Sequence, residues 1–103
     1  MNKFSGNEGD LNQGLNILVF TADWCGDCKF IKPFMPLVEK EYSQFNFIEI
    51  DIDQHKELAE KMSVKGIPSF IALNNGEEIG RFVNGDRKTK EEIDQFISGL
   101  KYK

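Results

Sequence analysis

A short apolar run that is closely followed by a long helical pattern limits most strongly how this chain can fold. Residues 17–22, with the sequence Ile-Leu-Val-Phe-Thr-Ala, are apolar and rich in β-forming side chains. Such a run is typical of a strand that is buried on both faces of a sheet. Apolar side chains then recur at helical spacing over residues 30–42, with charged residues between them. A doubly buried strand next to an amphipathic helix predicts an α/β fold.

Further elements alternate along the rest of the chain. The side-chain patterns predict strands at 45–52, 67–73 and 78–83, and helices at 56–62 and from residue 89 onwards. Asn75-Gly76 lies between the last two strands, and Asn-Gly is a strong hairpin signal. Thr89 and Glu92 have the spacing of a capping box at the start of the last helix.

The predicted order of elements is therefore β-α-β-α-β-β-α. Two βαβ crossovers and a terminal hairpin would give a mixed sheet with helices on both faces. Residues 1–15 contain Gly and Asn residues that break any periodicity, so we expect a lead-in with one short strand or helical turn. At 103 residues the chain has the length of a single domain, spanning residues 1–103.

Two prolines disturb the helical pattern that follows the first strand. Pro33 lies inside the pattern and is expected to kink the helix, because proline removes an amide donor and clashes with the preceding turn. Pro36 adds to this disturbance. We therefore expect one kinked helix at this place.

Charge and hydropathy limit the classes of protein to which the chain can belong. The formal net charge is −4 and the lysines are dispersed, which argues against a nucleic-acid partner because phosphate binding depends on clustered Lys and Arg. No apolar run approaches the roughly 20 residues that span a bilayer. The N-terminal residues lack the apolar core of a signal peptide. We therefore expect a cytoplasmic protein that binds neither nucleic acid nor membrane.

The chain has two cysteines, Cys25 and Cys28, and both lie between the first strand and the kinked helix. Two cysteines in a single Cys-Gly-Asp-Cys motif do not make a disulfide framework. In a cytosolic protein such a pair is more often catalytic, redox-sensing or metal-binding than structural. A thiolate at Cys25 would be stabilised by the positive end of the helix dipole and by unpaired amides. Cys28 lies one helical turn further on, within reach of a disulfide with Cys25.

Two other uses of the cysteine pair have less support. A tetrahedral zinc site needs four protein ligands, and only His55 remains as a typical nitrogen ligand, so we expect no metal. A purely structural disulfide would close so small a loop that it would remove little entropy from the unfolded chain.

His55 itself is expected to lie on the surface. A solvated helix start is expected at the charged residues Arg87, Lys88, Lys90, Glu91 and Glu92.

Four segments of the chain resemble features of the thioredoxin family: its active-site segment, its kinking proline, its cis-proline segment and its hairpin turn. They lie, in that order, at residues 22–29 (Ala-Asp-Trp-Cys-Gly-Asp-Cys-Lys), Pro33, residues 65–69 (Lys-Gly-Ile-Pro-Ser) and Asn75-Gly76. The resemblance covers nearly the whole chain from Ile17 to Leu100. It implies the thioredoxin fold, with a central mixed sheet and helices on both faces.

The resemblance also implies roles for individual residues. Cys25 would be the nucleophile that attacks a substrate disulfide, and Cys28 the resolving thiol that releases the reduced product. Pro68 is expected to be cis and to face the cysteines, while the backbone of Ile67 would pair with an extended substrate segment. Trp24 would shield the site, or would instead be a plain core aromatic. The expected substrate-binding residues are Trp24, Gly26, Asp27, Ile67, Pro68 and, by a looser match of spacing, Gly85.

The motif departs from the family at Asp27, where thioredoxins usually have proline. An acid beside the thiolate disfavours the negative charge on sulfur and shifts the couple towards a stronger reductant. The alternative interpretation is a solvated acid at a helix start, a position that favours acids in any case. The sequence leaves both interpretations open.

A further departure concerns a buried ion pair. Thioredoxins carry an Asp and a partner Lys where this chain has Val19 and Glu49, and a valine cannot transfer a proton. We hypothesise that Glu49 takes over the proton transfer, because burial without a cation makes a carboxylate hold a proton near neutral pH. The alternative is that Glu49 reaches solvent and has no such role.

These features together predict a monomeric thiol–disulfide oxidoreductase that reduces protein disulfides. The Cys25–Cys28 disulfide would be its redox group, and no other cofactor would be bound. A separate reductase would supply the electrons, although Asp27 argues against recognition by a standard thioredoxin reductase. The rival interpretations are an adaptor that binds a protein without turnover, an oxidase or isomerase, and a glutaredoxin.

Overall fold

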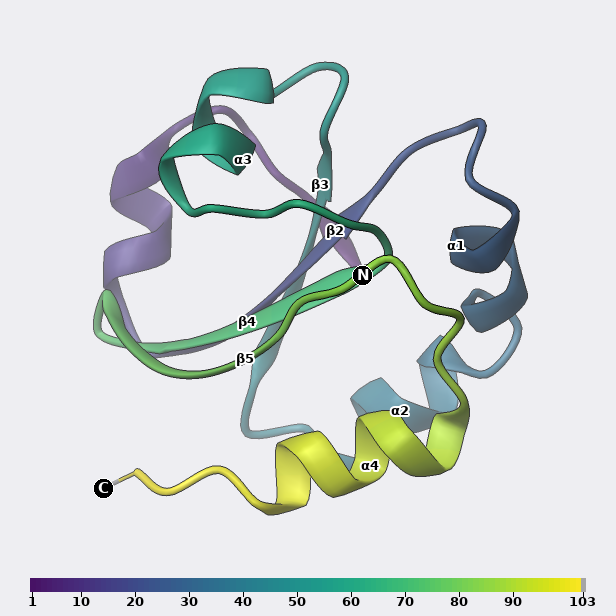
Figure 1. The fold of residues 1–103 in the computed structure, drawn as a ribbon. Helices are drawn as coiled ribbons and strands as arrows, with labels where there is room; N and C mark the ends of the chain where they lie inside the picture. Colours follow the sequence, from purple (N-terminus) through teal and green to yellow (C-terminus); the bar gives the residue numbers. More distant parts are fainter. Residues whose placement is uncertain (103) are drawn as a thin grey trace.

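The computed structural model describes residues 1–102 and contains a five-stranded sheet with helices on both faces (Figure 1). The strands are β1 (Asn2–Lys3), β2 (Leu15–Thr21), β3 (Asn46–Asp51), β4 (Ser69–Asn74) and β5 (Glu77–Phe82). The helices are the 3₁₀ helix η1 (Glu8–Asn12) and the α-helices α1 (Gly26–Ile31), α2 (Met35–Glu41), α3 (Lys56–Lys61) and α4 (Lys90–Ser98). Across the sheet the strands lie in the order β1-β3-β2-β4-β5. None of the helices in this described part is long and apolar enough to cross a bilayer.

β2 lies at the centre of the sheet, between β3 and β4. It pairs in parallel with β3, where Val19 lies opposite Glu49, and antiparallel with β4, where Val19 lies opposite Phe70. Every residue of β2 after Leu15 is buried. The prediction of a doubly buried strand before the cysteines is confirmed.

Side chains of β2 alternate between two hydrophobic cores. Ile17 and Val19 point into the core that α1, α2 and α4 cover, whereas Leu18 and Phe20 point into the core that η1 and α3 cover. All four side chains are fully buried. Burial of one such side chain contributes roughly 1.5–3 kcal/mol, so β2 anchors helices on both faces of the sheet.

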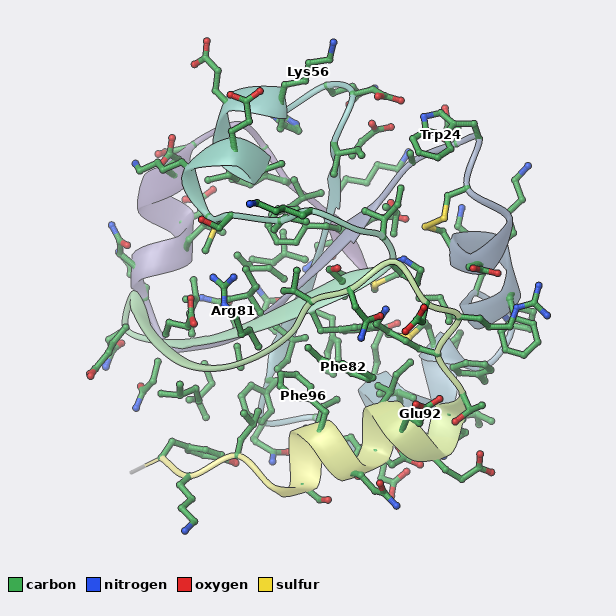
Figure 2. All side chains as sticks on the ribbon, viewed as in Figure 1. Trp24, Lys56, Arg81, Phe82, Glu92 and Phe96 are labelled. Carbon is green, nitrogen blue, oxygen red and sulfur yellow. A yellow bond between two sulfur atoms is a disulfide. The ribbon has the colours of Figure 1, made fainter. Side chains whose placement is uncertain are left out.

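Aromatic side chains pack the terminal hairpin against α4. The rings of Phe82 in β5 and Phe96 in α4 (Figure 2) lie 5.9 Å apart between their centroids. Phe82 also stacks on Phe70 in β4. Ile93 and Ile97 of α4 are buried in the same core. These contacts hold the loop between β5 and α4 close to the body of the sheet.

The helix after the cysteines is broken rather than kinked. α1 ends at Ile31 and α2 begins at Met35, with a turn at residues 32–34. Pro33 has no amide to donate to the helix, and Pro36 occupies the first turn of α2, where a missing amide costs no hydrogen bond. The second proline thus favours a new helix start, and the expected single helix becomes two.

The predicted second βαβ crossover is wrong. β3 runs parallel to β2, as a crossover requires, but β4 runs antiparallel to β2, with Ser69 opposite Phe20. The intervening helix α3 has six residues. Such a helix is about 9 Å long, whereas a strand of six residues extends over about 20 Å. The chain therefore enters β4 at the end of the sheet where β3 finishes, and then runs back.

The lead-in contains both elements that the sequence allowed. β1 extends the sheet by pairing in parallel with β3, where Asn2 lies opposite Ile48. η1 contributes the buried side chain of Leu11 to the core beneath α3. The lead-in therefore belongs to the packed structure and is more than a loose arm.

A capping box defines the start of α4. Thr89 Oγ1 accepts a hydrogen bond from the Glu92 amide at 3.2 Å, and Glu92 Oε1 accepts one from the Thr89 amide at 3.0 Å. The predicted box is thus confirmed. It also anchors one end of the loop that carries Arg87, which contacts Asp27 in α1.

Replacing the cap should weaken the fold measurably. Thr89→Ala should lower the free energy of unfolding by about 1 kcal/mol, because the variant lacks the acceptor for an otherwise unpaired helix amide. Thr89→Ser keeps the hydroxyl group and should stay close to the wild type. Urea unfolding followed by circular dichroism measures both values. Equal stabilities of the alanine and serine variants would show that the cap contributes nothing.

Candidate active site

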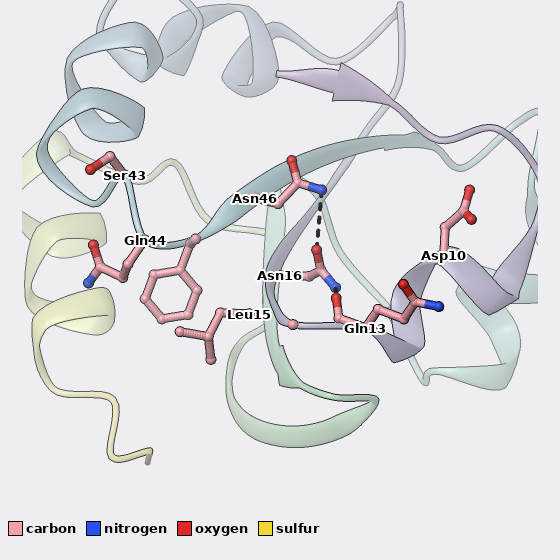
Figure 3. A pocket seen from close by; sticks show the side chains of 9 residues that line it. Asp10, Gln13, Leu15, Asn16, Ser43, Gln44 and Asn46 are labelled. Carbon is pink, nitrogen blue, oxygen red and sulfur yellow. Dashed lines mark hydrogen bonds between the residues drawn. The ribbon is translucent and has the colours of Figure 1, made fainter.

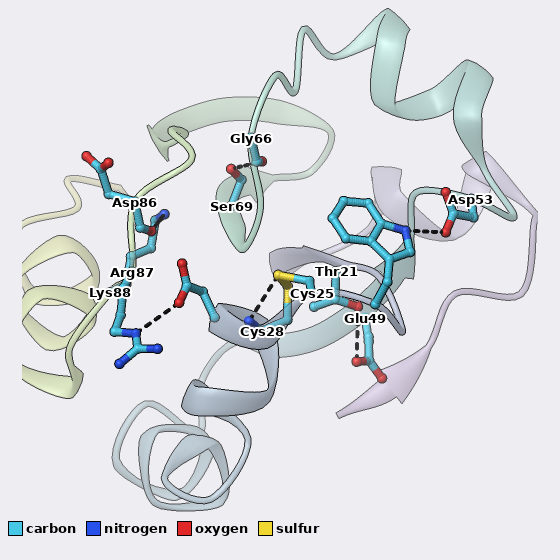
Figure 4. Close-up of a disulfide and its surroundings, with 12 residues drawn as sticks. Thr21, Cys25, Cys28, Glu49, Asp53, Gly66, Ser69, Asp86, Arg87 and Lys88 are labelled. Carbon is cyan, nitrogen blue, oxygen red and sulfur yellow. Dashed lines mark hydrogen bonds and ion pairs between the residues drawn. A yellow bond between two sulfur atoms is a disulfide. The ribbon is translucent and has the colours of Figure 1, made fainter.

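Cys25 and Cys28 form a disulfide at the start of α1, after the loop that follows β2 (Figure 4). Their Cα atoms lie 5.2 Å apart. Cys25 is the N-cap residue of α1, and its Sγ accepts a hydrogen bond from the Cys28 amide at 3.1 Å. In the reduced protein this amide and the positive end of the helix dipole favour a thiolate at Cys25.

The disulfide is largely covered by apolar side chains. Cys28 is 1% exposed and Cys25 is 6% exposed. Ala22, Ile52 and Ile67 pack around the two cysteines. Cys25 is therefore the more accessible of the pair, which suits the residue that meets a substrate first.

The segment before β4 packs against the disulfide. The Ile67–Pro68 peptide bond is cis, as predicted. Pro68 is buried, and Ile67 packs on the cysteine cluster. Ser69 Oγ donates a hydrogen bond to the Gly66 carbonyl and closes the turn around the proline (Figure 4).

Gly66 is a site residue that the sequence argument missed. A Cβ at this position would overlap the backbone of Asn84 and Gly85, so the loop after β5 packs directly on the main chain of Gly66. Gly85, the weaker sequence prediction, is exposed and has open space where a Cβ would lie. The one signal in the sequence that could have pointed to this contact is a glycine immediately before the Ile-Pro pair.

Trp24 lies at the surface next to Cys25 (Figure 2). Its side chain is 66% exposed, and its Nε1 donates a hydrogen bond to Asp53 Oδ2 at 2.8 Å. The alternative interpretation of Trp24 as a core aromatic is therefore wrong. The sequence analysis did not predict a role for Asp53. Its position follows from the topology, because β2 and β3 are parallel and bring their carboxyl ends, and the residues that follow them, to the same edge of the sheet.

Known proteins share this arrangement. The thioredoxin family model matches residues 7–99. The chain belongs to the thioredoxin family. Human thioredoxin is 38% identical over 86 residues, which cover 84% of this chain and 79% of that protein. An H-type thioredoxin from Ricinus communis is 33% identical over 91 residues, which cover 88% of this chain and 75% of that protein.

Solved thioredoxin structures match the fold as well. The X-ray structure of Fasciola hepatica thioredoxin has a TM-score of 0.80 at 29% sequence identity, covering 98% of this chain and 100% of that chain. The expected thioredoxin fold is thus confirmed. As a member of this family, the chain is a thiol–disulfide oxidoreductase with a redox-active Cys25–Cys28 disulfide.

Asp27, the residue by which this motif departs from the usual thioredoxin motif, is paired with a cation. Arg87 Nε donates a hydrogen bond to Asp27 Oδ1 at 2.9 Å (Figure 4). The Arg87 guanidinium also lies over the ring of Phe30, 4.4 Å from its centroid. Asp27 is therefore neither an uncompensated charge beside the cysteines nor simply a solvated acid.

Lys88 is buried, so the prediction of a solvated charge cluster before α4 is wrong at this residue. Its Nζ donates hydrogen bonds to the Asn84 carbonyl at 3.2 Å, to Asn84 Oδ1 at 2.9 Å and to the Asp86 carbonyl at 2.9 Å. Burial lowers the pKa of Lys88, while nearby carboxylates, Asp27 among them, act in the opposite direction. The three acceptors explain how the ammonium group can be buried at all.

Glu49 is half-buried, and its side chain accepts a hydrogen bond from Thr21 Oγ1 at 3.2 Å (Figure 4). It lines a cavity of about 130 Å³ together with Lys3 and Lys32. Val19, its neighbour on β2, is fully buried. Glu49 is therefore only half-buried, unlike the buried carboxylate that we hypothesised, and its role in proton transfer stays a prediction.

Other parts of the molecule offer weaker candidate sites. A hollow of about 500 Å³ lies at the start of β2, at the far end of the strand from the disulfide (Figure 3). Asn16, buried in its wall, donates to the Leu11 and Gln13 carbonyls and accepts a hydrogen bond from Asn46, so it has a structural role. Within residues 1–102, no three His, Cys, Asp or Glu side chains come together as metal ligands would.

The close approach at Gly66 can be tested with a matched glycine from the opposing loop. Gly66→Ala should lower the free energy of unfolding by about 1–3 kcal/mol, because the added methyl group has no space. Gly85→Ala should change it by less than about 0.5 kcal/mol, as expected of an exposed site. Denaturant unfolding measures both. Wild-type stability of Gly66→Ala would contradict the packing of this loop on Gly66.

Proposed function

We propose that this chain reduces disulfide bonds of other proteins, with Cys25 as the attacking thiolate and Cys28 as the resolving thiol. The observation that carries the proposal is the position of Cys25 at the start of α1, where its sulfur accepts a hydrogen bond from the Cys28 amide. This contact favours the thiolate, the nucleophilic form, at Cys25. The greater burial of Cys28 supports the order of attack, because the more accessible sulfur meets the substrate first.

The reaction is a two-step exchange of disulfides. The Cys25 thiolate attacks one sulfur of the substrate disulfide, a mixed disulfide forms, and the other substrate sulfur leaves as a thiolate that takes up a proton. Cys28 then loses its proton and attacks the Cys25 sulfur, so that the second substrate sulfur leaves. The substrate gains two electrons and two protons and becomes a dithiol, and the protein is left with its Cys25–Cys28 disulfide.

Groups around the disulfide support the binding of an extended substrate segment. Ile67 lies before β4 begins at Ser69, outside the strand pairs of the sheet, so its backbone can pair with a substrate strand. Pro68 has no amide that would compete for the thiolate. Trp24 offers an exposed ring beside Cys25, and Gly26 has no side chain to obstruct the approach.

A separate reductase is the proposed source of electrons. The disulfide must be reduced again after each turnover, and the chain has no cysteine besides Cys25 and Cys28 to pass electrons to it. We place the protein in a reducing compartment, the cytoplasm, where thiols are kept reduced. We propose that it acts there as a monomer, without a bound cofactor.

The two cysteines should have separable effects on turnover. Cys28→Ser should accumulate a mixed disulfide with a protein substrate, because attack by Cys25 proceeds and resolution does not. Cys25→Ser should abolish both the adduct and the reduction. Insulin reduction by dithiothreitol, followed by turbidity and non-reducing electrophoresis, measures these outcomes.

An adaptor that binds a protein without turnover is the second candidate function, and the exposed ring of Trp24 favours it. If it is correct, Cys25→Ser retains the full function and wild-type protein reduces insulin no faster than dithiothreitol alone. Activity with dithiothreitol but not with a standard thioredoxin reductase would instead show a competent dithiol that this reductase does not recognise.

For Glu49 we propose the role of proton acceptor from Cys28, because it is a half-buried carboxylate on β3, the strand next to β2. Glu49→Gln removes the charge at nearly constant shape, so resolution of the mixed disulfide should slow by about tenfold or more near neutral pH. Rapid-mixing measurements of this step across the pH range provide the test. Glu57→Gln, on the exposed surface of α3, is the control. If the pH profiles of this step coincide for Glu49→Gln, Glu57→Gln and the wild type, Glu49 is not the proton acceptor.

A further inference from the structure

An ion pair connects the active-site helix to the loop before α4. Asp27 lies between the two cysteines, and its side chain is 34% exposed. Arg87 Nε binds Asp27 Oδ1 at 2.9 Å, and the guanidinium stacks over Phe30 at 4.4 Å. Asp27 and Phe30 are three residues apart on α1 and therefore share one face of the helix. Arg87 is thus held at two points of the helix that carries Cys28.

The loop that carries Arg87 is itself held in place. Lys88 is buried and its Nζ binds three acceptors on Asn84 and Asp86. The main chain at residues 84 and 85 packs on Gly66, which adjoins the cis-proline segment. The guanidinium therefore projects from a braced loop towards α1, and Asp27 interacts electrostatically with the Lys88 ammonium as well.

The charge of Asp27 would act on the cysteines if it were alone. A carboxylate next to a thiolate disfavours the ionised sulfur, and hence the reduced form of the pair. A guanidinium at hydrogen-bond distance from the carboxylate opposes this field, because the two opposite charges form a close pair. Without Arg87, Asp27 would make the pair a stronger reductant with a less reactive Cys25.

We propose that Arg87 is a positioning residue that sets the reduction potential and the thiolate reactivity of the Cys25–Cys28 pair by neutralising Asp27. Arg87 acts through Asp27 and does not itself contact the sulfurs. The inference concerns the same disulfide as the proposed function, but it does not require that the substrate be a protein.

A double-mutant cycle tests the proposal in defined dithiothreitol redox buffers, with no protein substrate. Arg87→Gln should shift the equilibrium about threefold towards the disulfide, as expected of a partly exposed ion pair. A threefold shift corresponds to a potential lower by about 14 mV, because a tenfold change in a two-electron couple is about 30 mV. Asp27→Asn should shift the equilibrium in the opposite direction or leave it unchanged. In the Asp27→Asn background the guanidinium has lost the carboxylate that holds it beside α1, so Arg87→Gln should shift the equilibrium by less than it does in the wild type.

The rate at which iodoacetamide alkylates reduced Cys25 at pH 7 provides an independent readout. Arg87→Gln should be alkylated about threefold more slowly, because a smaller fraction of Cys25 is thiolate. The difference should shrink at about 1 M salt, where the Debye length is about 3 Å. Arg87→Lys keeps the charge and should stay close to the wild type. Arg81→Gln, which breaks an ion pair with Glu78 on β5, is the matched control and should not change either readout.

Two results would overturn the proposal. Equal shifts by Arg87→Gln with and without Asp27 would show that Arg87 does not act through this carboxylate. An unchanged potential and alkylation rate, with weaker turnover of insulin alone, would make Arg87 a docking residue instead. Loss of insulin reduction in the wild type, with the expected cycle intact, would reject the proposed function and leave this inference standing.

Discussion

β2 carries apolar side chains on both faces and ends shortly before Cys25, so its burial determines where the disulfide lies. Ile17 and Val19 anchor one layer of helices, and Leu18 and Phe20 anchor the other. If β2 were exposed, both hydrophobic cores would be lost together, because the helices on each face pack on this same strand. The disulfide at the end of this strand therefore lies on a rigid part of the fold. A reactive group needs such a support, because it must keep its position.

The site is completed by segments that are distant in sequence. α1 supplies the capping amide, the segment at Gly66 and Ile67 supplies the wall opposite the sulfurs, and Asp53 fixes the indole of Trp24. Sheet topology brings these segments together. β3 runs parallel to β2 and ends at the same edge, and β4 begins at that edge because it runs antiparallel. The direction of β4, which the sequence argument had wrong, is thus essential for placing Ile67, the residue before cis-Pro68, against the cysteines.

Electrostatics at the site depends on the loop before α4 as well as on the motif itself. Asp27 taken alone predicts a more reducing pair, whereas Asp27 with Arg87 on one side and the buried Lys88 nearby predicts a much smaller effect. Arg87 lies 60 positions after Asp27 in the sequence, so the motif alone gives no sign of this partner. A charge in a motif therefore has no defined influence until its partners are known.

The sequence by itself determined the order of strands and helices, the redox pair and the capping box at Thr89, because these depend on local spacing and on residue types with few alternatives. The cis bond before Pro68 followed from the resemblance to the thioredoxin family. Only the tertiary structure decided the direction of β4, the break between α1 and α2, the contact that requires Gly66, and the partners of Trp24, Asp27 and Lys88. The physical reason is the range of the interactions. Helix caps and hairpin turns act over a few residues, whereas burial and ion pairing depend on which distant segments the packed sheet brings into contact.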